Sequence, residues 1–295
     1  MKPAPFRYLA ARTTDEVVEQ FAEHGPDARI LAGGQSLIRL MNTRLAEPSL
    51  LVDINGVEEL DRIDRRDGTV VIGALTRQRT SELSDTVRAA VPLLAEAGAL
   101  VAHPSVRSRG TVVGSVCFAD PAAELPTALR ALDGEVVARS ARGERVIAAE
   151  DFFVAAHETS LEPDEFAVEV RVPVSAGTRT GSAFLELSRR HGELPVCGVA
   201  VTVALDPSGH LSDVRIALGS VAGRPVRARR AEAAMSNAQP SAEAIAGAAD
   251  LAAADLSPVS DCHGSAAFRR HLAVALTKRA LTRAIARADG EQTDA

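Results

Sequence analysis

The sequence predicts an α+β fold in two parts, a larger N-terminal one and a smaller C-terminal one. In the first part, segments with the apolar period of helices are mixed with short alternating segments typical of strands. In the second part, strand-like segments come first and helical segments follow, from residue 182 to residue 288. This switch from strands to helices predicts a separate packing unit in which helices cover a sheet.

The N-terminal elements can be placed in order. Thr13 and Glu16 form a capping-box pattern, which predicts a helix over 14–24 that ends at Gly25. The segments after it are a strand ending at 30–31, a turn at 33–36, an amphipathic segment at 37–45, strands at 50–54 and 69–74, a helical segment at 83–100 with a break near Pro92, a helix at 122–132, and strands at 135–139, 144–148 and 165–172.

The C-terminal elements follow a linker-like run, VSAGTRTG, at 174–181. They are strands at 182–187, 196–205 and 211–221, the last two joined by a turn at 206–209, and helices at 227–237, 241–255 and 265–288. We therefore expect a three-stranded antiparallel sheet with helices, and domains over 1–176 and 177–290.

Charge and composition argue against nucleic acid as a partner. The net charge is −6, and aromatic residues make up only 3% of the chain with no Trp, so neither a cationic surface nor a stacking platform for bases is expected. One basic cluster interrupts this pattern, in the run GRPVRARR. We interpret its side chains as a solvated helix entrance: Arg224, Arg227, Arg229 and Arg230.

The cysteine pattern and the apolar runs bear on location. Three cysteines with no close pair argue against a disulfide framework and against a zinc site of the CxxC kind. The opening residues MKPAPFRYLA lack the apolar core of a signal peptide, and no apolar run is long enough for a membrane span. We expect a cytoplasmic protein without a membrane span.

The stretch RILAGGQSLIRLM, residues 29–41, places two glycines between a strand and a helix. Glycine permits positive φ and lets a ligand approach the backbone N–H groups, and a following helix start adds unpaired donors. Such a loop suits a phosphate. A tight turn with no ligand is the alternative, because neither GxGxxG nor the Walker pattern GxxxxGK[ST] is present.

A second cluster of turn and hydroxyl residues lies at 103–129, in HPSVRSRGTVVGSVCFADPAAELPTAL. Gly110-Thr111, Gly114-Ser115 and the run from Asp120 to Glu124 would supply further N–H groups, hydroxyls and carboxylates. Two such loops would be able to face one pyrophosphate, which favours a ligand over a simple turn.

At this point the sequence resembles a known family. The runs ILAGGQSLIRLMNTRLAEPSLLVDI, IGALTR, HPSVRSRGT, ADPAAELP and FLELSRRHGELPVCGVAV are similar, in that order, to the FAD-binding medium subunits of molybdenum hydroxylases. The resemblance covers residues 5 to about 285. It implies FAD in an extended pose between two N-terminal subdomains, about 1–56 and 57–176, with the C-terminal domain covering the isoalloxazine ring.

The resemblance assigns FAD-contacting residues singly. The first loop would hold the pyrophosphate through its backbone: Ala32, Gly33, Gly34, Gln35, Ser36 and Leu37. The second loop would hold the same phosphates through Thr111, Gly114 and Ser115. The other implied contacts are Asp120 and Glu124 near the ribityl and ribose hydroxyls, Leu161 at the adenine end, and Phe118, Glu186 and Leu194 near the flavin.

Three positions depart from the family pattern. Val113 replaces the first glycine of the second loop, which predicts a hindered backbone approach or a shifted loop. Phe118 stands where histidine or threonine is common, and Glu186 stands where lysine is common. An anion in place of a cation would disfavour an anionic reduced flavin.

The resemblance implies an electron-transfer flavoprotein subunit. A large molybdenum subunit would oxidise the substrate, a small subunit with [2Fe–2S] clusters would relay single electrons, and FAD would pass them on in pairs to NAD⁺, oxygen or a quinone. Three scattered cysteines do not supply the four thiolates of a cluster, so the clusters belong to another chain. We predict no catalytic residue and no metal site here. A stand-alone FAD-dependent oxidoreductase and a scaffold subunit that has lost its flavin remain alternatives.

Overall fold

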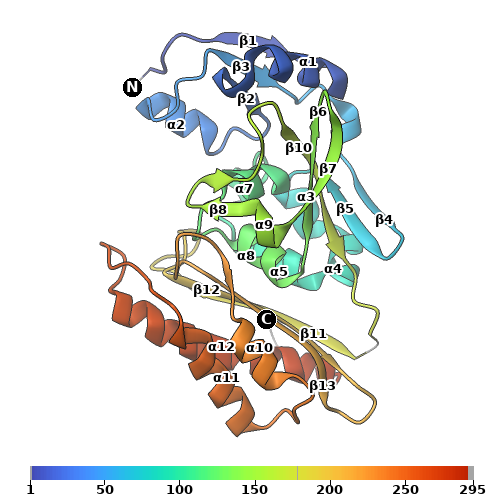
Figure 1. Ribbon diagram of the computed structural model, residues 1–295, viewed down its shortest axis with the longest axis vertical. Coiled ribbons are helices and arrows are strands. Elements are labelled where there is room, and N and C mark those ends of the chain that lie inside the picture. Colours follow the sequence, from blue (N-terminus) through green and yellow to red (C-terminus); the bar gives the residue numbers. More distant parts are fainter. Residues whose placement is uncertain (1, 178, 292–295) are drawn as a thin grey trace.

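The computed structural model describes residues 2–177 and 179–291, which form an upper and a lower part in Figure 1. Residue 178, within the predicted linker 174–181 and the C-terminal domain, lies outside the described residues, and so does residue 1. The architecture mixes helices and strands throughout, as the α+β prediction requires. Among the described helices, we find none with the length and apolarity that a bilayer span needs.

The first N-terminal layer is a small parallel sheet with strand order β1-β3-β2. Its elements are β1 (Arg7–Ala10), α1 (Thr14–His24), β2 (Ala28–Leu31), α2 (Leu37–Thr43) and β3 (Leu50–Asp53). The Thr13 hydroxyl accepts a hydrogen bond from the Glu16 N–H at 3.2 Å, as the capping pattern predicts. Val17 and Phe21, on the same face of α1, are buried.

The second N-terminal layer is an antiparallel sheet with strand order β4-β5-β10-β6-β7. Its strands are β4 (Ile63–Arg66), β5 (Thr69–Gly73), β6 (Glu135–Ser140), β7 (Gly143–Ala148) and β10 (Phe166–Pro173). Between them lie α3 (Gln78–Leu83), α4 (Asp85–Ala90), α5 (Pro92–Leu100), α6 (Pro104–Arg107), α7 (Val112–Phe118), α8 (Glu124–Ala131), α9 (Ala149–Phe152) and the short pair β8 (Phe153–Ala155) and β9 (Glu158–Thr159).

The C-terminal part contains four strands in the order β11-β12-β13-β14, so the expectation of three is wrong by one. They are β11 (Thr180–Leu187), β12 (Cys197–Leu205), β13 (Leu211–Gly219) and β14 (Val226–Arg227), followed by α10 (Arg229–Met235), α11 (Ala242–Ala254) and α12 (Ala266–Ala288). β14 pairs Arg227 with Ala217 and Val226 with Leu218. Two residues are too few to show an alternating pattern, which explains the omission.

The C-terminal sheet is buried on both faces. Phe184, Ala200 and Ala217 belong to the core of the N-terminal part. Their strand neighbours, among them Val199, Val201, Ile216 and Leu218, pack in the other core with α10, α11 and α12. Figure 1 shows this sheet between the N-terminal helices and α10–α12. The alternation of side chains along each strand therefore joins the two parts through a shared apolar layer.

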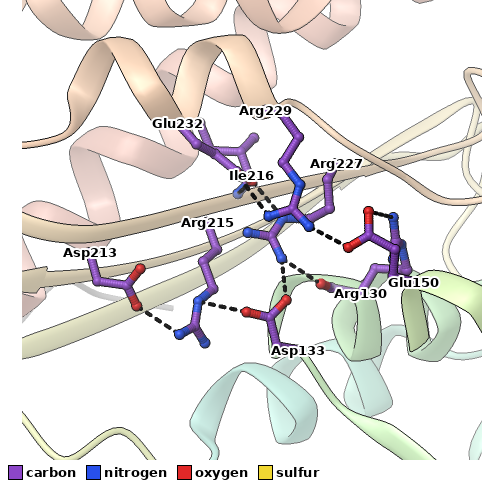
Figure 2. A network of polar contacts seen from close by, with 9 residues as sticks. All are labelled: Arg130, Asp133, Glu150, Asp213, Arg215, Ile216, Arg227, Arg229 and Glu232. Carbon is purple, nitrogen blue, oxygen red and sulfur yellow. Dashed lines mark hydrogen bonds and ion pairs between the residues drawn. The ribbon is translucent and has the colours of Figure 1, made fainter. Parts of the chain in front are cut away.

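Ion pairs reinforce the same junction (Figure 2). Arg227, in β14, donates to Asp133 Oδ1 at 2.5 Å, to the Arg130 carbonyl at 3.1 Å and to Glu232 Oε1 at 2.5 Å. Arg215 Nε lies 3.1 Å from Asp133 Oδ2. Asp133 and Arg130 belong to the N-terminal part, so Arg227 connects the two parts.

The same contacts correct the interpretation of GRPVRARR as a solvated helix entrance. The Arg227 side chain is only 3% exposed, and Arg229 donates to Glu150 Oε2 at 2.5 Å across the junction. Arg224 donates to the Phe153 carbonyl at 2.9 Å. Arg230 alone fits the expectation, since its exposed side chain pairs with exposed Asp255. The cluster is a docking element within the chain.

Candidate functional site

The first loop, residues 32–37 between β2 and α2, leaves a run of backbone donors without partners. Gly34 adopts φ 71°, a conformation that favours glycine. Within the described residues, none of the backbone N–H groups of residues 33–37 donates a hydrogen bond inside the chain. The residues themselves are half-buried. Consecutive free N–H groups at the start of a helix form a concave donor set suited to an anion.

The second loop, residues 109–115, is fixed to the start of α3 and to the residues just before it. The Gln78 N–H donates to the Gly110 carbonyl at 2.8 Å, and the Val112 N–H donates to the Thr76 carbonyl at 3.1 Å. The buried Thr111 then caps α7, because its hydroxyl accepts from the Gly114 N–H at 3.1 Å. The loop is therefore held on both sides before the helix begins.

The two loops are in direct backbone contact. A Cβ atom on Gly33 would lie 2.7 Å from Gly110 Cα and closer still to the Arg109 carbonyl oxygen. Only glycine allows this approach without moving one of the two backbones. The structure thus brings together the segments that sequence analysis paired, although they are about 75 residues apart in the chain.

The second loop has fewer free donors than the resemblance implies. The N–H groups of Gly114 and Ser115 already donate to the Thr111 hydroxyl and carbonyl, both at 3.1 Å. The half-buried Ser115 hydroxyl has no partner among the described residues. Val113 is 3% exposed and packs in the N-terminal core. Its side chain therefore lies on the buried side of α7, away from exposed Gly114.

Three carboxyl groups lie where the two parts meet. Asp120 Oδ1 accepts from the Ala122 N–H at 2.9 Å, and Glu124 follows at the start of α8. Burial raises the pKa of Glu124 to about 7, and the charge of Asp120 adds to the shift. Burial and the charge of Glu124 raise the pKa of Glu186, in β11, to about 8. Glu186 Oε2 is buried without a hydrogen-bond partner. The described contacts therefore favour a protonated Glu186 at neutral pH and leave Glu124 close to half protonated.

This carboxyl cluster predicts a pH-dependent stability. Glu186 has an ordinary pKa of 4.5 and a folded-state value of about 8, so the unfolded chain ionises first as pH rises. Stability should fall from about pH 4.5 to about pH 8 and level off above it. In Glu186→Gln this fall should be smaller by about 1–3 kcal/mol, after discounting for partial exposure.

Urea unfolding at a series of pH values measures the effect. Exposed Glu193 supplies the matched control, since Glu193→Gln removes the same charge without releasing a buried carboxyl. Parallel stability curves for wild type and Glu186→Gln would contradict the burial of this group as an acid.

The remaining predicted contacts are more dispersed. Phe118 is half-buried and its ring lies 4.6 Å from that of His157. Leu161 packs partly buried against the N-terminal core, and Leu194 is 56% exposed. The roles of Phe118 and Leu194 near the flavin and of Leu161 at the adenine end stay predictions.

Sequence analysis missed Asn55 and Arg77 as site residues. Asn55 Nδ2 donates to the Ala32 carbonyl at 3.0 Å, and Arg77 donates to the Arg109 carbonyl at 2.8 Å. Arg77 lies within the quoted run IGALTR, but no motif spacing assigns it a role. Its function depends on contacts between distant segments, which a local pattern does not reveal.

The paired loops present a set of backbone donors suited to a phosphate-bearing cofactor. Two family matches specify the class. Residues 4–175 match the FAD binding domain in molybdopterin dehydrogenase, and residues 182–284 match the CO dehydrogenase flavoprotein C-terminal domain. The chain belongs to the family of FAD-binding medium subunits of molybdenum hydroxylase-type dehydrogenases. Members are subunits of FAD-containing oxidoreductase complexes, as sequence analysis predicted.

Individual relatives match along nearly the full length. The chain is 42% identical to the 6-hydroxypseudooxynicotine dehydrogenase complex subunit alpha of Paenarthrobacter nicotinovorans, over 98% of this chain and 97% of the relative. It is 38% identical to the carbon monoxide dehydrogenase medium chain of Hydrogenophaga pseudoflava, over 97% and 99%. A solved structure of carbon monoxide dehydrogenase from that organism, which lacks the Mo-pyranopterin moiety of the molybdenum cofactor, matches with TM-score 0.94 at 40% identity, over 97% and 99%.

Proposed function

We propose that this chain is the electron-transfer flavoprotein subunit of a molybdenum hydroxylase-type dehydrogenase, taking electrons from an iron–sulfur subunit and passing them to an external acceptor. The observation that carries the proposal is the contact of two glycine-containing loops, with a run of free N–H groups in the first. A dinucleotide cofactor presents a pyrophosphate with negative charge that such donors satisfy. Because the chain belongs to a family of FAD-binding subunits, FAD is the dinucleotide that we assign to this site.

The residues present fit FAD better than they fit a chain that has lost its flavin. Gly33 still makes the backbone approach that a Cβ would block, and Gly34 keeps its positive φ. Val113, the departure that raised the question, is buried in the core rather than exposed on the loop. The scaffold alternative requires the site to have decayed, and the first loop retains its geometry.

The chain's own residues would bind, orient and shield the cofactor. Loop N–H groups hold the pyrophosphate end, and the carboxyl of Glu186 holds a proton at the junction of the two parts. Bound FAD would supply the ability to accept electrons singly and deliver them in pairs. Glu186, protonated at neutral pH, would add no negative charge, which weakens the earlier objection that an anion replaces a cation.

Partner subunits are supported by the relatives, which are subunits of dehydrogenase complexes. Its cysteines are separate: Cys117 is half-buried, Cys197 is buried and Cys262 is exposed. Among the described residues, no group of three or more His, Cys, Asp or Glu side chains is arranged to hold a metal ion. We assign the [2Fe–2S] clusters to a small subunit and the molybdenum cofactor to a large subunit. We place the complex in the cytoplasm, where unpaired thiols persist.

Purification distinguishes the candidate functions. We expect the chain, expressed alone, to bind FAD in a one-to-one ratio measured by flavin absorbance after denaturation. Co-expressed with a small iron–sulfur subunit and a large molybdenum subunit from the same organism, it should elute with them and carry electrons from their substrate to a soluble dye. Flavin without any association, together with direct oxidation of an organic substrate, would favour the stand-alone oxidoreductase. A chain that binds no FAD would refute the proposal.

A further inference from the structure

A chain of hydrogen bonds connects the two loops through side chains outside both of them. Tyr8 donates to Asp53 Oδ2 at 2.6 Å, and the Asn55 side chain donates to Asp53 Oδ1 at 2.6 Å. Arg77 donates to Asn55 Oδ1 at 2.6 Å and, with its other terminal nitrogen, to the Arg109 carbonyl at 2.8 Å. This series of hydrogen bonds thus extends from β1 to the second loop.

Asn55 completes the connection to the first loop. Its amide nitrogen donates to the Ala32 carbonyl at 3.0 Å, and its amide oxygen accepts from Arg77. One Asn–Arg pair therefore holds the carbonyl that precedes Gly33 and the carbonyl that precedes Gly110. Because each carbonyl and the following N–H belong to one planar peptide, fixing the Ala32 carbonyl also fixes the direction of the free Gly33 N–H. The Gly110 N–H already donates to the Val106 carbonyl at 2.8 Å, so on that side the pair holds the backbone of the second loop in place.

The positive charges at this point form no close ion pairs. Neither Arg77 nor Arg109 has a carboxylate within ion-pair distance among the described residues. Burial and then the neighbouring charge of Arg109 lower the pKa of Arg77 from its ordinary value, and the charges of Asp61 and Asp53 offset only part of this shift. Two guanidinium groups that repel each other beside unpaired backbone donors leave a local positive potential, which an anion would relieve.

We propose that Asn55 and Arg77 are positioning residues for the cofactor pyrophosphate, and that Arg77 and Arg109 supply the positive potential that attracts it. The inference rests on the proposed function, since it names how the same site recognises its dinucleotide. It goes further by giving two distinct roles, geometry and charge, to Asn55 and Arg77 outside the glycine loops and to the side chain of Arg109 at the edge of the second loop. The ligand class is a dinucleotide or nucleotide with a pyrophosphate group.

The positioning role and the charge role predict different effects of salt on ligand binding. Electrostatic attraction between partly exposed groups is screened as ionic strength rises, whereas a fixed hydrogen-bonded geometry is not. Arg77→Lys keeps a charge but loses the planar fork that reaches two acceptors. Asn55→Ala removes the link to Ala32 and leaves both arginines. Arg109→Gln removes a charge from an exposed side chain that makes no polar contact in the described structure.

The experiment titrates apo-protein with FAD, and separately with ADP and adenosine, at low and high ionic strength. We expect Arg109→Gln to weaken FAD and ADP binding about three- to tenfold at low ionic strength and to flatten the salt dependence. Asn55→Ala and Arg77→Lys should weaken both ligands about tenfold with the salt dependence unchanged. Adenosine, which has no phosphate, should bind all variants equally.

Controls separate this inference from the proposed function. Arg66→Gln removes the same charge from the β4–β5 hairpin, where Arg66 pairs with Asp64, and should leave FAD binding unchanged. If wild type binds FAD but Arg109→Gln and Asn55→Ala bind FAD and ADP as wild type does, the roles inferred for these residues are contradicted and the proposed function stands. If wild type binds no FAD, both fall. Unfolding curves verify that the Asn55 and Arg77 variants are folded.

Discussion

Replacing Gly33 with alanine is expected to lower the affinity for FAD by about 10- to 100-fold. The added methyl group would meet two backbone groups of the second loop, the Arg109 carbonyl and Gly110 Cα, and neither can rotate away as a side chain would. The loops would have to separate, and the free N–H groups of the first loop would no longer converge with the Ser115 hydroxyl of the second on one pyrophosphate. FAD titration of the apo-protein and the flavin content after purification measure the loss.

Gly247→Ala is the matched control. Gly247 lies in α11 with open space around its Cα, so the same substitution meets nothing there and should raise helix stability slightly. Its FAD affinity should equal that of wild type. If Gly33→Ala also bound FAD normally, the contact between the loops would have no part in holding the cofactor.

The fold could be predicted where local patterns decide it. The helix over 14–24 has the predicted bounds because its cap and its apolar face are both local features. The break near Pro92 is real, since α4 ends at Ala90 and α5 begins at Pro92. The strands that were missed have weak patterns. β1 is largely exposed, and β4, IDRR, forms a polar hairpin with β5.

The site was only partly predictable for a related reason. The glycines at 33 and 34 indicate an unusual backbone conformation or a close approach at their own positions, so the first loop could be found from the sequence. Thr111 was placed in a loop, and the structure shows that it caps α7, a short helix whose apolar run resembles a strand. The link from Asn55 to Arg77 and the closeness of Glu124 to Glu186 depend on tertiary packing. The local periodicity of the sequence carries no information about such contacts.

Arg227→Met is expected to destabilise the chain by about 3–5 kcal/mol, because it leaves the buried Glu232 carboxylate without its main partner. Burial alone would disfavour the charged arginine, but Glu232 and Asp133 hold its pKa above the ordinary value. Glu232 is 9% exposed and would keep only the Ile216 N–H and a longer ion pair to Arg229. Methionine fills similar volume, so the loss reports on charge and hydrogen bonds rather than on a cavity. Denaturant unfolding measures it.

Arg230→Met tests the alternative that any arginine of this basic run would have the same effect. Arg230 and its partner Asp255 are both exposed, so screening by water should keep the change within about 0.5 kcal/mol. A second variant, Arg227→Met with Glu232→Gln, should recover part of the loss, because the buried carboxylate that the first substitution orphaned is no longer charged. Equal losses of unfolding free energy in Arg227→Met and Arg230→Met would contradict a stabilising role for the buried ion pair of Arg227 with Glu232. If the double variant showed no recovery, the lost stability would instead come from the contacts of Arg227 with Asp133 and the Arg130 carbonyl. These are the two contacts that cross between the parts.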